Sequence, residues 1–258
     1  MLELSGLSKH FGGVKAVDGL DLTVNEGEIF GLIGPNGSGK STTINLICGV
    51  FAETAGTVRF RGDLMNGKPP HRRLRAGIAR TFQNIRLFPN LTVWQNLWVA
   101  QNSRQDVATQ GFLPRWFGAT RRTRQEIAGL LELADLGHKD DELASNLAFG
   151  EQRRLEFARA AAARPKLLLL DEPAAGMNQQ EIDDLSQRIR RVRDSGVTIL
   201  LVEHVMELVM GVTEQMAVLN FGRKIASGTP GEVQRDRAVQ EAYLGTAGST
   251  SRPGEGGD

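Results

Sequence analysis

The sequence contains one cysteine, Cys48, and no apolar run near the roughly 18 residues that a membrane-spanning helix needs. A single cysteine excludes an internal disulfide framework and a multi-cysteine metal site. The lack of a long apolar run excludes a transmembrane segment. The net charge is only +1, so no overall field favours nucleic acid as a partner. The N-terminal Met1 to Leu4 also lacks the layout of a secretory signal. We therefore expect a soluble protein of a reducing compartment.

Strand and helix patterns alternate along most of the chain. Apolar strands are predicted at residues 2–4, 20–24, 29–33, 57–60, 167–170 and 197–202, and helices at 41–48, 150–163 and 179–194. The later strands are apolar throughout rather than at every second residue, which predicts a mostly parallel sheet with both faces covered. Residues 90–146 carry helical spacing instead and predict an inserted helical subdomain. The low complexity of residues 248–258 predicts a disordered tail.

The most specific motif is a glycine-rich loop between a predicted strand and a predicted helix. Residues 34–41 read Gly-Pro-Asn-Gly-Ser-Gly-Lys-Ser and fit G-x-x-x-x-G-K-[ST]. Backbone N–H groups of such a loop, at a helix N-terminus, bind the polyphosphate of a nucleotide. Lys40 is expected to contact the β- and γ-phosphates, and Ser41 to bind Mg²⁺. The predicted nucleotide-binding residues here are Gly34, Pro35, Asn36, Gly37, Ser38, Gly39, Lys40, Ser41 and Thr42.

Polar side chains follow two of the apolar strands. Asp171 and Glu172 come directly after Leu170, at the strand end where ligands bind in open α/β sheets. Asp171 is predicted to be the metal-side carboxylate, and Glu172 to orient or deprotonate an attacking water. His204 follows strand 197–202 at the same rim and is expected to face the γ-phosphate. The remaining histidines have no such placement and are predicted to lie on the surface: His10, His71 and His138.

Three further segments resemble an ABC-type ATPase. Residues 81–84 resemble the glutamine loop of that family, residues 147–152 its signature motif, and residues 173–178 its D-loop. The order of the motifs holds over about residues 2–245. The resemblance implies an α/β P-loop NTPase fold with a RecA-like, mostly parallel core and a small antiparallel β subdomain. It also implies one ABC ATPase domain over residues 1–247, with the helical subdomain inserted at about 90–160.

The resemblance also implies roles for individual residues. Gln83 would join Ser41 and Asp171 as a Mg²⁺ ligand, and would join Glu172 and His204 in the catalytic set. Phe11 matches the aromatic residue that stacks on the base, with a core position in the small sheet as the alternative.

The signature motif would contact the nucleotide of a second chain through Ala148, Phe149, Gly150 and Glu151. Ala148 replaces the serine of the commonest signature, so one side-chain donor is lost. The contact must then rest on backbone N–H groups and the N-terminal dipole of the following helix.

Several segments narrow the resemblance to the ATP-binding subunit of Liv-type branched-chain amino-acid importers: residues 80–88, 146–156, 171–176 and 242–245. This resemblance implies a Mg²⁺-dependent ATPase that dimerises with a copy of itself or a related chain. Its partners would be transmembrane permease subunits and, indirectly, a periplasmic solute-binding protein, without nucleic acid. It would be peripheral, at the cytoplasmic face of the inner membrane.

Alternative functions remain open at this point. One keeps the ATPase role and changes the solute to urea, an amide or an exported lipid. Another is a non-transport ABC ATPase, but the interval from Gln83 to Leu147 shows no sustained heptads that would indicate the coiled coil of such proteins. A P-loop kinase would leave the signature motif and His204 unexplained.

Two surface segments carry less specific patterns. The basic cluster at residues 70–75 predicts a solvated helix face rather than a site for an anionic partner. Residues 111–117, with Phe112 and Trp116, predict either a loop that covers the helical subdomain or a surface that docks the membrane subunits.

Overall fold

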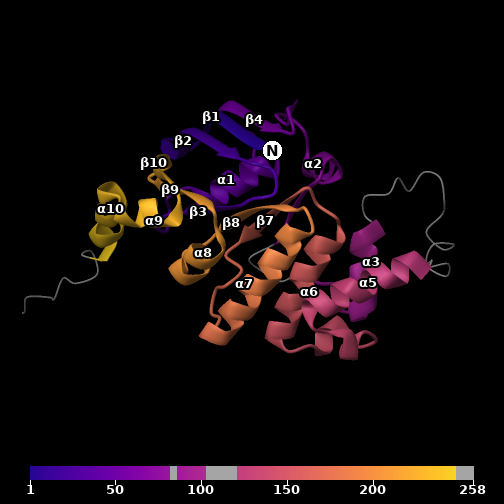
Figure 1. The fold of residues 1–258 in the computed structure, drawn as a ribbon. Helices are drawn as coiled ribbons and strands as arrows, with labels where there is room; N and C mark the ends of the chain where they lie inside the picture. The colour runs from indigo at the N-terminus through magenta and orange to yellow at the C-terminus, as the bar shows by residue number, and fades with distance from the viewer. Residues whose placement is uncertain (82–85, 103–120, 248–258) are drawn as a thin grey trace, which may run out of the picture.

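The computed structural model describes residues 1–81, 86–102 and 121–247, and its centre is a six-stranded sheet (Figure 1). The strand order is β10-β9-β3-β8-β7-β6. Neighbouring strands from β9 to β6 are parallel, and β10 pairs antiparallel with β9. The strands are β3 (Ile29–Ile33), β6 (Ile78–Arg80), β7 (Leu167–Asp171), β8 (Thr198–Val202), β9 (Gln215–Asn220) and β10 (Arg223–Gly228). The predicted mostly parallel sheet is confirmed.

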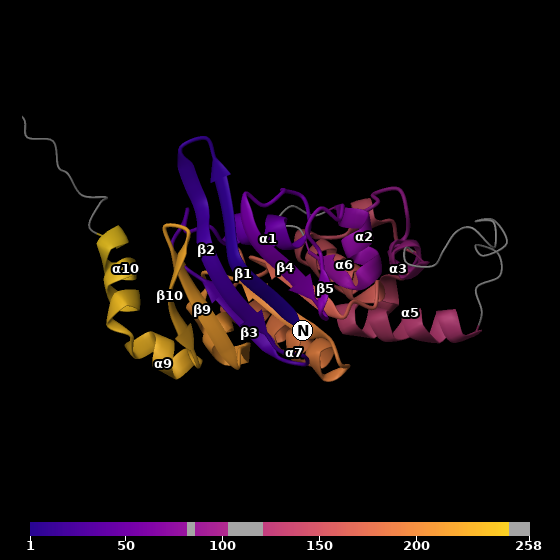
Figure 2. The same ribbon diagram turned by 90° about the horizontal axis from the view of Figure 1, so that it is seen from above.

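A smaller antiparallel sheet, of order β2-β1-β4-β5, lies across the first (Figure 2). Its strands are β1 (Leu2–Phe11), β2 (Val14–Val24), β4 (Ala55–Phe60) and β5 (Asp63–Leu64). The β1 and β2 strands are longer than predicted. Gly6 and Gly19 have positive φ values, and the β1–β2 pairing shifts register between Leu4 and Leu7. Such a bulge breaks the alternation of buried and exposed residues on which the sequence prediction relied.

The two faces of the six-stranded sheet are buried against different partners. Leu167 and Leu169 of β7 pack in a core with the small sheet and α1 (Lys40–Ile47). Leu168 and Leu170 point to the other face and pack against α7 (Gln179–Asp194) and α8 (Met206–Val212). The same core includes residues of α9 (Pro230–Arg235) and α10 (Arg237–Ala247). Burial on both faces explains why these strands are apolar at every position.

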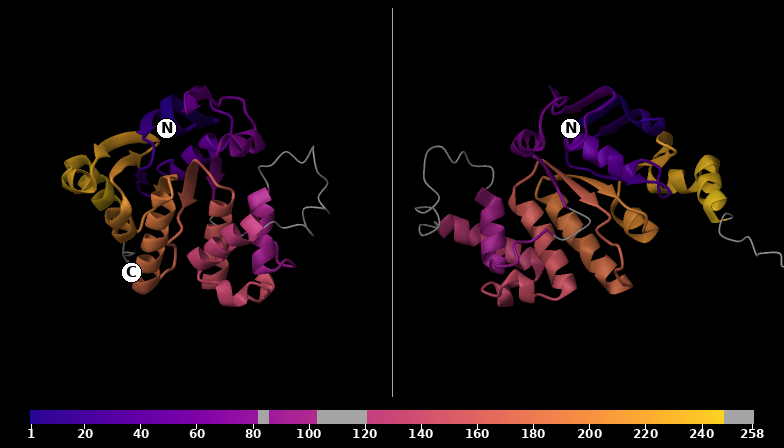
Figure 3. Two further views of the ribbon diagram at one scale, coloured as in Figure 1. Left: turned by 45° about the vertical axis from the view of Figure 1, so that its right-hand side comes forward. Right: turned by 180° about the vertical axis from the view of Figure 1, so that it is seen from behind.

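The predicted helical subdomain is a separate group of helices beside β7 (Figure 3). It comprises α3 (Val93–Asn102), α5 (Arg121–Ala134), the 3₁₀ turns η1 (Gly137–Lys139) and η2 (Ala144–Asn146), and α6 (Phe149–Ala162). Val93, Leu97, Ile127 and Leu155 share a core that is distinct from the cores of the main sheet. No helix among the described residues is long and apolar enough to cross a membrane.

The prediction for the basic cluster is wrong at Arg73. The cluster forms α2 (Pro70–Ala76), but the Arg73 side chain is only 2% exposed. Its guanidinium donates hydrogen bonds to the carbonyl oxygens of Leu46 at 2.6 Å, Ile47 at 2.9 Å and Lys68 at 2.9 Å. Leu46 and Ile47 lie in the last turn of α1, where carbonyl oxygens lack the partners of the helix interior, and that of Leu46 also accepts the N–H of Gly49 at 3.1 Å. Arg73 therefore caps α1 from a neighbouring helix.

The surface prediction holds only in part for His10, whose side chain is 32% exposed. Its Nε2 is buried and lies 3.9 Å from Oδ1 of Asp18. His71 and His138 are exposed, as predicted. The segments 111–117 and 248–258 lie outside the described residues.

Candidate nucleotide site

The phosphate loop joins β3 to α1, as the motif requires. Lys40 is the first residue of α1 and is buried, with Nζ donating hydrogen bonds to the carbonyl oxygens of Gly34 at 2.7 Å and Pro35 at 3.0 Å. Burial lowers the pKa of Lys40, while the carboxylates of Glu172 and Asp171 oppose this shift. The lysine is thus held across the loop, with negative charges at the neighbouring strand ends.

Two glycines of the loop are required by close backbone approaches. Gly34 and Gly39 have φ values of 150° and 105°, which L side chains rarely adopt. A Cβ atom at Gly34 would lie 2.2 Å from the carbonyl oxygen of Leu219, and one at Gly39 would lie 2.4 Å from that of Ala16. The loop therefore packs tightly against β9 and β2, and side chains at these positions would displace it.

The other predicted loop residues surround this cradle. Asn36, Gly37 and Ser41 are exposed and Thr42 is half-buried, so they are accessible to a ligand. Ser38 is buried, and its hydroxyl oxygen has no hydrogen-bond partner within residues 1–81, 86–102 and 121–247. Buried hydroxyl groups are usually hydrogen-bonded, so this one fits a loop whose hydroxyl would bond a phosphate oxygen.

Asp171 lies at the end of β7, next to the phosphate loop, and is 4% exposed. Its Oδ2 forms a buried ion pair with Nη2 of Arg80 at 2.7 Å. The carboxylate of Asp171 and the hydroxyl of Ser41 are hard oxygen donors, which suit Mg²⁺. Among the described residues, no group of three or more His, Cys, Asp or Glu side chains could hold a metal ion alone. Mg²⁺ commonly takes one or two carboxylates together with phosphate oxygens, and the donors at Asp171 and Ser41 would fit such a site.

The predicted catalytic residues Glu172 and His204 are brought together by neighbouring strand ends. Nδ1 of His204 lies 3.8 Å from Oε1 of Glu172, and the imidazole is half exposed. Glu172 has a φ of 48°, and its N–H donates to the carbonyl oxygen of Val202 at 2.8 Å, which fixes the strained residue at the rim. Gln83, the third residue of the predicted catalytic set, lies outside the described residues.

Glu203 is a site residue to which sequence reasoning gave no role. It is fully buried, and Oε1 accepts a hydrogen bond from the N–H of Ala174 at 2.7 Å. Its Oε2 accepts from the N–H groups of His204 at 2.8 Å and Val205 at 3.1 Å. One carboxylate thus joins the loop after β7 to the loop after β8. The signal for it was a charged residue between a fully apolar strand and the histidine.

Phe11 ends β1 and is 44% exposed, so the alternative of a core position in the small sheet is wrong. Its ring packs edge-on against Phe51, with centroids 5.3 Å apart, and Nζ of Lys9 lies 5.0 Å from the Phe11 centroid. This contact covers part of the aromatic ring and leaves an exposed surface on the β1–β2 hairpin. An exposed, fixed aromatic ring suits stacking on a base.

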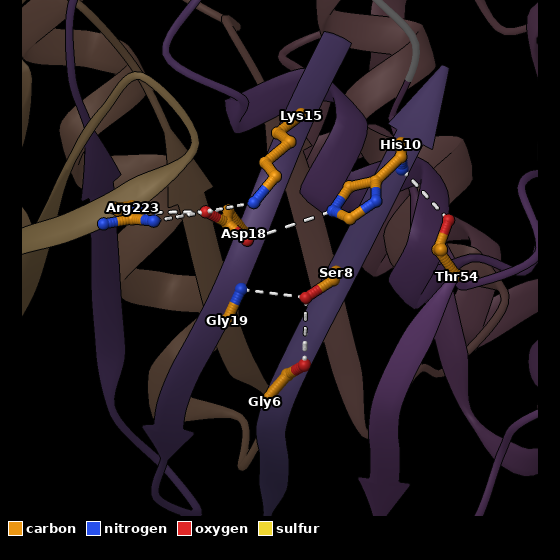
Figure 4. A network of polar contacts seen from close by, with 8 residues as sticks. All are labelled: Gly6, Ser8, His10, Lys15, Asp18, Gly19, Thr54 and Arg223. Carbon is orange, nitrogen blue, oxygen red and sulfur yellow. Dashed lines mark hydrogen bonds and ion pairs between the residues drawn. The ribbon is translucent and has the colours of Figure 1, made fainter. Parts of the chain in front are cut away.

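The hairpin that carries Phe11 is tied to the phosphate loop through the β9–β10 turn and the start of β10, and Figure 4 shows the contact between Arg223 and Asp18. Arg223 donates two hydrogen bonds to Oδ2 of Asp18, at 2.9 and 2.6 Å, and this contact holds the pKa of Asp18 below its ordinary value. The N–H of Asp18 donates to the carbonyl oxygen of Gly222. The N–H of Gly222 in turn donates to the carbonyl oxygen of Ser38 in the phosphate loop. The candidate base-stacking and phosphate-binding segments are thereby fixed relative to each other.

The signature residues begin α6. Ala148 is the N-cap, and its N–H donates to Oε2 of Glu151 at 3.0 Å. Lys139 also pairs with Glu151, and these contacts lower the pKa of the Glu151 carboxyl. Phe149, directly before Gly150, is 63% exposed. The guanidinium of Arg153 lies 4.5 Å from the centroid of the Phe149 ring. The helix N-terminus and its aromatic side chain are therefore exposed to a second molecule.

Two protein families match parts of this chain. Residues 17–175 match the ABC transporter family, and residues 223–249 match the branched-chain amino acid ATP-binding cassette transporter family. The chain is 42% identical to the branched-chain amino acid transport ATP-binding protein BraF of Pseudomonas aeruginosa, over 96% of this chain and 98% of that protein. It is 36% identical to the lipopolysaccharide export ATP-binding protein LptB of Escherichia coli K12, over 95% of this chain and 97% of LptB.

A solved structure, the ADP conformation of an ATP-binding cassette from an ABC transporter, superposes with a TM-score of 0.80. The two chains are 30% identical, and the match covers 95% of this chain and 98% of that one. The chain therefore belongs to the ABC transporter family, as one of its ATP-binding subunits. It is an ATPase of the P-loop class, and the predicted fold is confirmed.

Proposed function

We propose that this chain is the ATP-hydrolysing subunit of an importer for branched-chain or other hydrophobic amino acids. The observation that carries the proposal is the match of residues 223–249, in β10, α9 and α10, to a branched-chain amino acid transporter family. The similarity to BraF over nearly the whole chain supports it. The subunit would be peripheral, at the cytoplasmic face of the inner membrane, and would act on the solute-binding protein only through the permease.

Within this function, the residues at the sheet rim have separate tasks. Lys40 and the loop N–H groups would bind the phosphates, and Phe11 would stack on the base. Glu172 would accept a proton from the attacking water, because it is the carboxylate that leaves the strand end beside His204. Mg²⁺, held by Ser41, Gln83 and Asp171, would neutralise charge on the phosphate oxygens. His204 would hold the terminal phosphoryl group by a hydrogen bond.

A second chain would complete the site. The exposed Phe149 and the N–H groups at the start of α6 would contact the nucleotide bound to the partner's phosphate loop. The macrodipole of α6 favours an anion at this end. Ala148 supplies no side-chain hydroxyl, so the backbone of Gly150 and its neighbours must provide the polar contacts. The partner would be another copy or a related chain.

A hollow of about 410 Å³ is a candidate docking site for the permease. It lies between α2, β6, α3 and α6, and its lining includes Leu74, Phe88, Val99 and Arg159. Phe88 is 45% exposed, and the guanidinium of Arg159 lies 5.7 Å from its ring centroid. An exposed aromatic residue beside apolar and cationic groups suits a protein segment that emerges from a membrane. We propose this hollow in addition to residues 111–117.

Uptake of labelled solutes by cells that lack this gene tests the cargo. We expect loss of leucine and isoleucine uptake, with recovery by the wild-type chain and none by Glu172→Gln, which should bind ATP without turnover. Recovery of uptake with Glu172→Gln would remove Glu172 as the catalytic base. Unchanged amino-acid uptake with loss of urea or amide uptake would move the proposal to those solutes. The similarity to LptB makes lipid export the second candidate. Unchanged uptake of amino acids, urea and amides alike would favour it.

A further inference from the structure

Arg80 is a buried cation next to the candidate metal carboxylate, and the proposed mechanism gives it no task. It ends β6, and its side chain is 14% exposed. Nη2 donates to Oδ2 of Asp171 at 2.7 Å, and Nη1 donates to Oδ1 of Asn45 at 2.6 Å. The guanidinium therefore joins β6, the end of β7 and helix α1.

Asn45 connects this contact to the phosphate loop. It lies four residues after Ser41 in α1, so the two side chains project from the same side of the helix. The planar guanidinium holds both partners at once with fixed geometry, which an ammonium group does not do. Arg80 thus positions the carboxylate of Asp171 relative to the helix that carries Ser41.

Arg80 is the positive charge that pairs with the buried carboxylate of Asp171. Asp171 is nearly fully buried, and a buried carboxylate needs a paired positive charge. Burial raises the pKa of the neighbouring Cys48 thiol to about 11, so that group is neutral at pH 7. Arg80 supplies the positive charge when no metal ion is bound. A carboxylate has about four lone-pair positions, so pairing with Arg80 leaves capacity for a metal ion.

We propose that Arg80 is a positioning residue and an internal counter-ion that sets the affinity of this site for the divalent cation. The inference rests on the proposed role of Asp171. Because Arg80 already neutralises the carboxylate and repels a second cation, it weakens Mg²⁺ binding. The site therefore stays ordered without metal, and it releases the metal ion more readily after hydrolysis.

Two substitutions separate the charge of Arg80 from its hydrogen bonds. Arg80→Gln removes the charge and keeps an N–H donor, whereas Arg80→Lys keeps the charge and loses the planar fork. The readout is the thermal midpoint of the full chain with saturating ADP, measured as MgCl₂ is titrated. The control is the affinity for ADP in EDTA. Neither substitution should change it by more than about twofold, which is small beside a tenfold change, worth about 1.4 kcal/mol.

We expect the Mg²⁺ concentration at half-effect to fall about tenfold in Arg80→Gln, which corresponds to about 1.4 kcal/mol. It should stay near the wild-type value in Arg80→Lys. An unchanged Mg²⁺ dependence in Arg80→Gln, or the same change in both variants, would overturn the counter-ion role. If Mg²⁺ has no effect on the wild-type chain itself, the proposed metal site fails instead.

Should Arg80→Gln not fold, the double variant Arg80→Gln/Asp171→Asn decides the matter. Removing both charges should restore the thermal midpoint in EDTA to near the wild-type value, because no unpaired buried charge remains. If the second substitution restores nothing, Arg80 does not act as the counter-ion of Asp171.

Discussion

The buried guanidinium of Arg73 offers a direct measure of how the helix behind the phosphate loop is stabilised. Arg73→Leu removes charged donors from the carbonyl oxygens of Leu46 and Ile47, at 2.6 and 2.9 Å. Leaving a buried acceptor unsatisfied costs about 1–3 kcal/mol. The carbonyl oxygen of Leu46 keeps the N–H of Gly49 at 3.1 Å, so the acceptors that lose their donor are those of Ile47 and Lys68. These two losses, partly offset by relief from burying a charged group, predict a net destabilisation of about 3 kcal/mol.

Thermal unfolding without nucleotide, followed by circular dichroism, measures this change. For a domain of this size each kcal/mol shifts the midpoint by about 2–4 °C, so we expect a decrease of about 6–12 °C. Arg72→Leu and Arg75→Leu are matched controls, because both residues are exposed on the same helix. Surface substitutions of this kind change stability by about 0.5 kcal/mol or less. A midpoint for Arg73→Leu within the range of the two controls would refute the capping role.

Two further predictions concern exposed aromatic side chains. Phe11→Ala should weaken ATP binding by about 1–3 kcal/mol, the usual worth of stacking on a base, while Phe11→Trp should retain it. Fluorescence titration with ATP measures both, and equal affinities for the wild type and Phe11→Ala would exclude stacking. Phe88→Ser should abolish co-purification with the permease and leave ATP binding intact. Phe221→Ser, at an 84% exposed position on the β9–β10 turn, is its control and should co-purify normally; loss of co-purification in both variants would argue against the hollow.

The parts of the candidate site that depend on neighbouring residues can be read from the sequence alone. A phosphate loop needs its glycines, Lys40 and Ser41 within eight residues, so the pattern is visible without any tertiary information. Strands buried on both faces are apolar at every position, which made β7 and β8 recognisable. Asp171 and Glu172 after β7, and His204 after β8, then indicated the rim where ligands bind.

Several helices and strands were not predicted from the sequence, each for a physical reason. β6 has only three residues, too few for a period to be seen, and it is stabilised by pairing with β7. The β9–β10 hairpin and helices α8 and α10 pack against the main sheet without a strong local pattern. Helix α9 did carry a local signal, because Thr229 and Glu232 form a capping box with Pro230 at the first helical position. A pattern of charges is equally ambiguous, because a basic run on a helix reads the same whether a side chain points outward or inward.

The sequence alone determined the class of chemistry, because phosphate binding and strand-end carboxylates depend on residue types at short, fixed spacings. Only the tertiary structure decided which distant residues act together. Arg73 and the end of α1 are about 27 positions apart in the chain, and Arg80 and Asp171 are 91 apart. Whether such a cation is solvated, caps a helix or pairs with a carboxylate depends on what the folded chain places against it, and that contact leaves no periodic trace in the sequence.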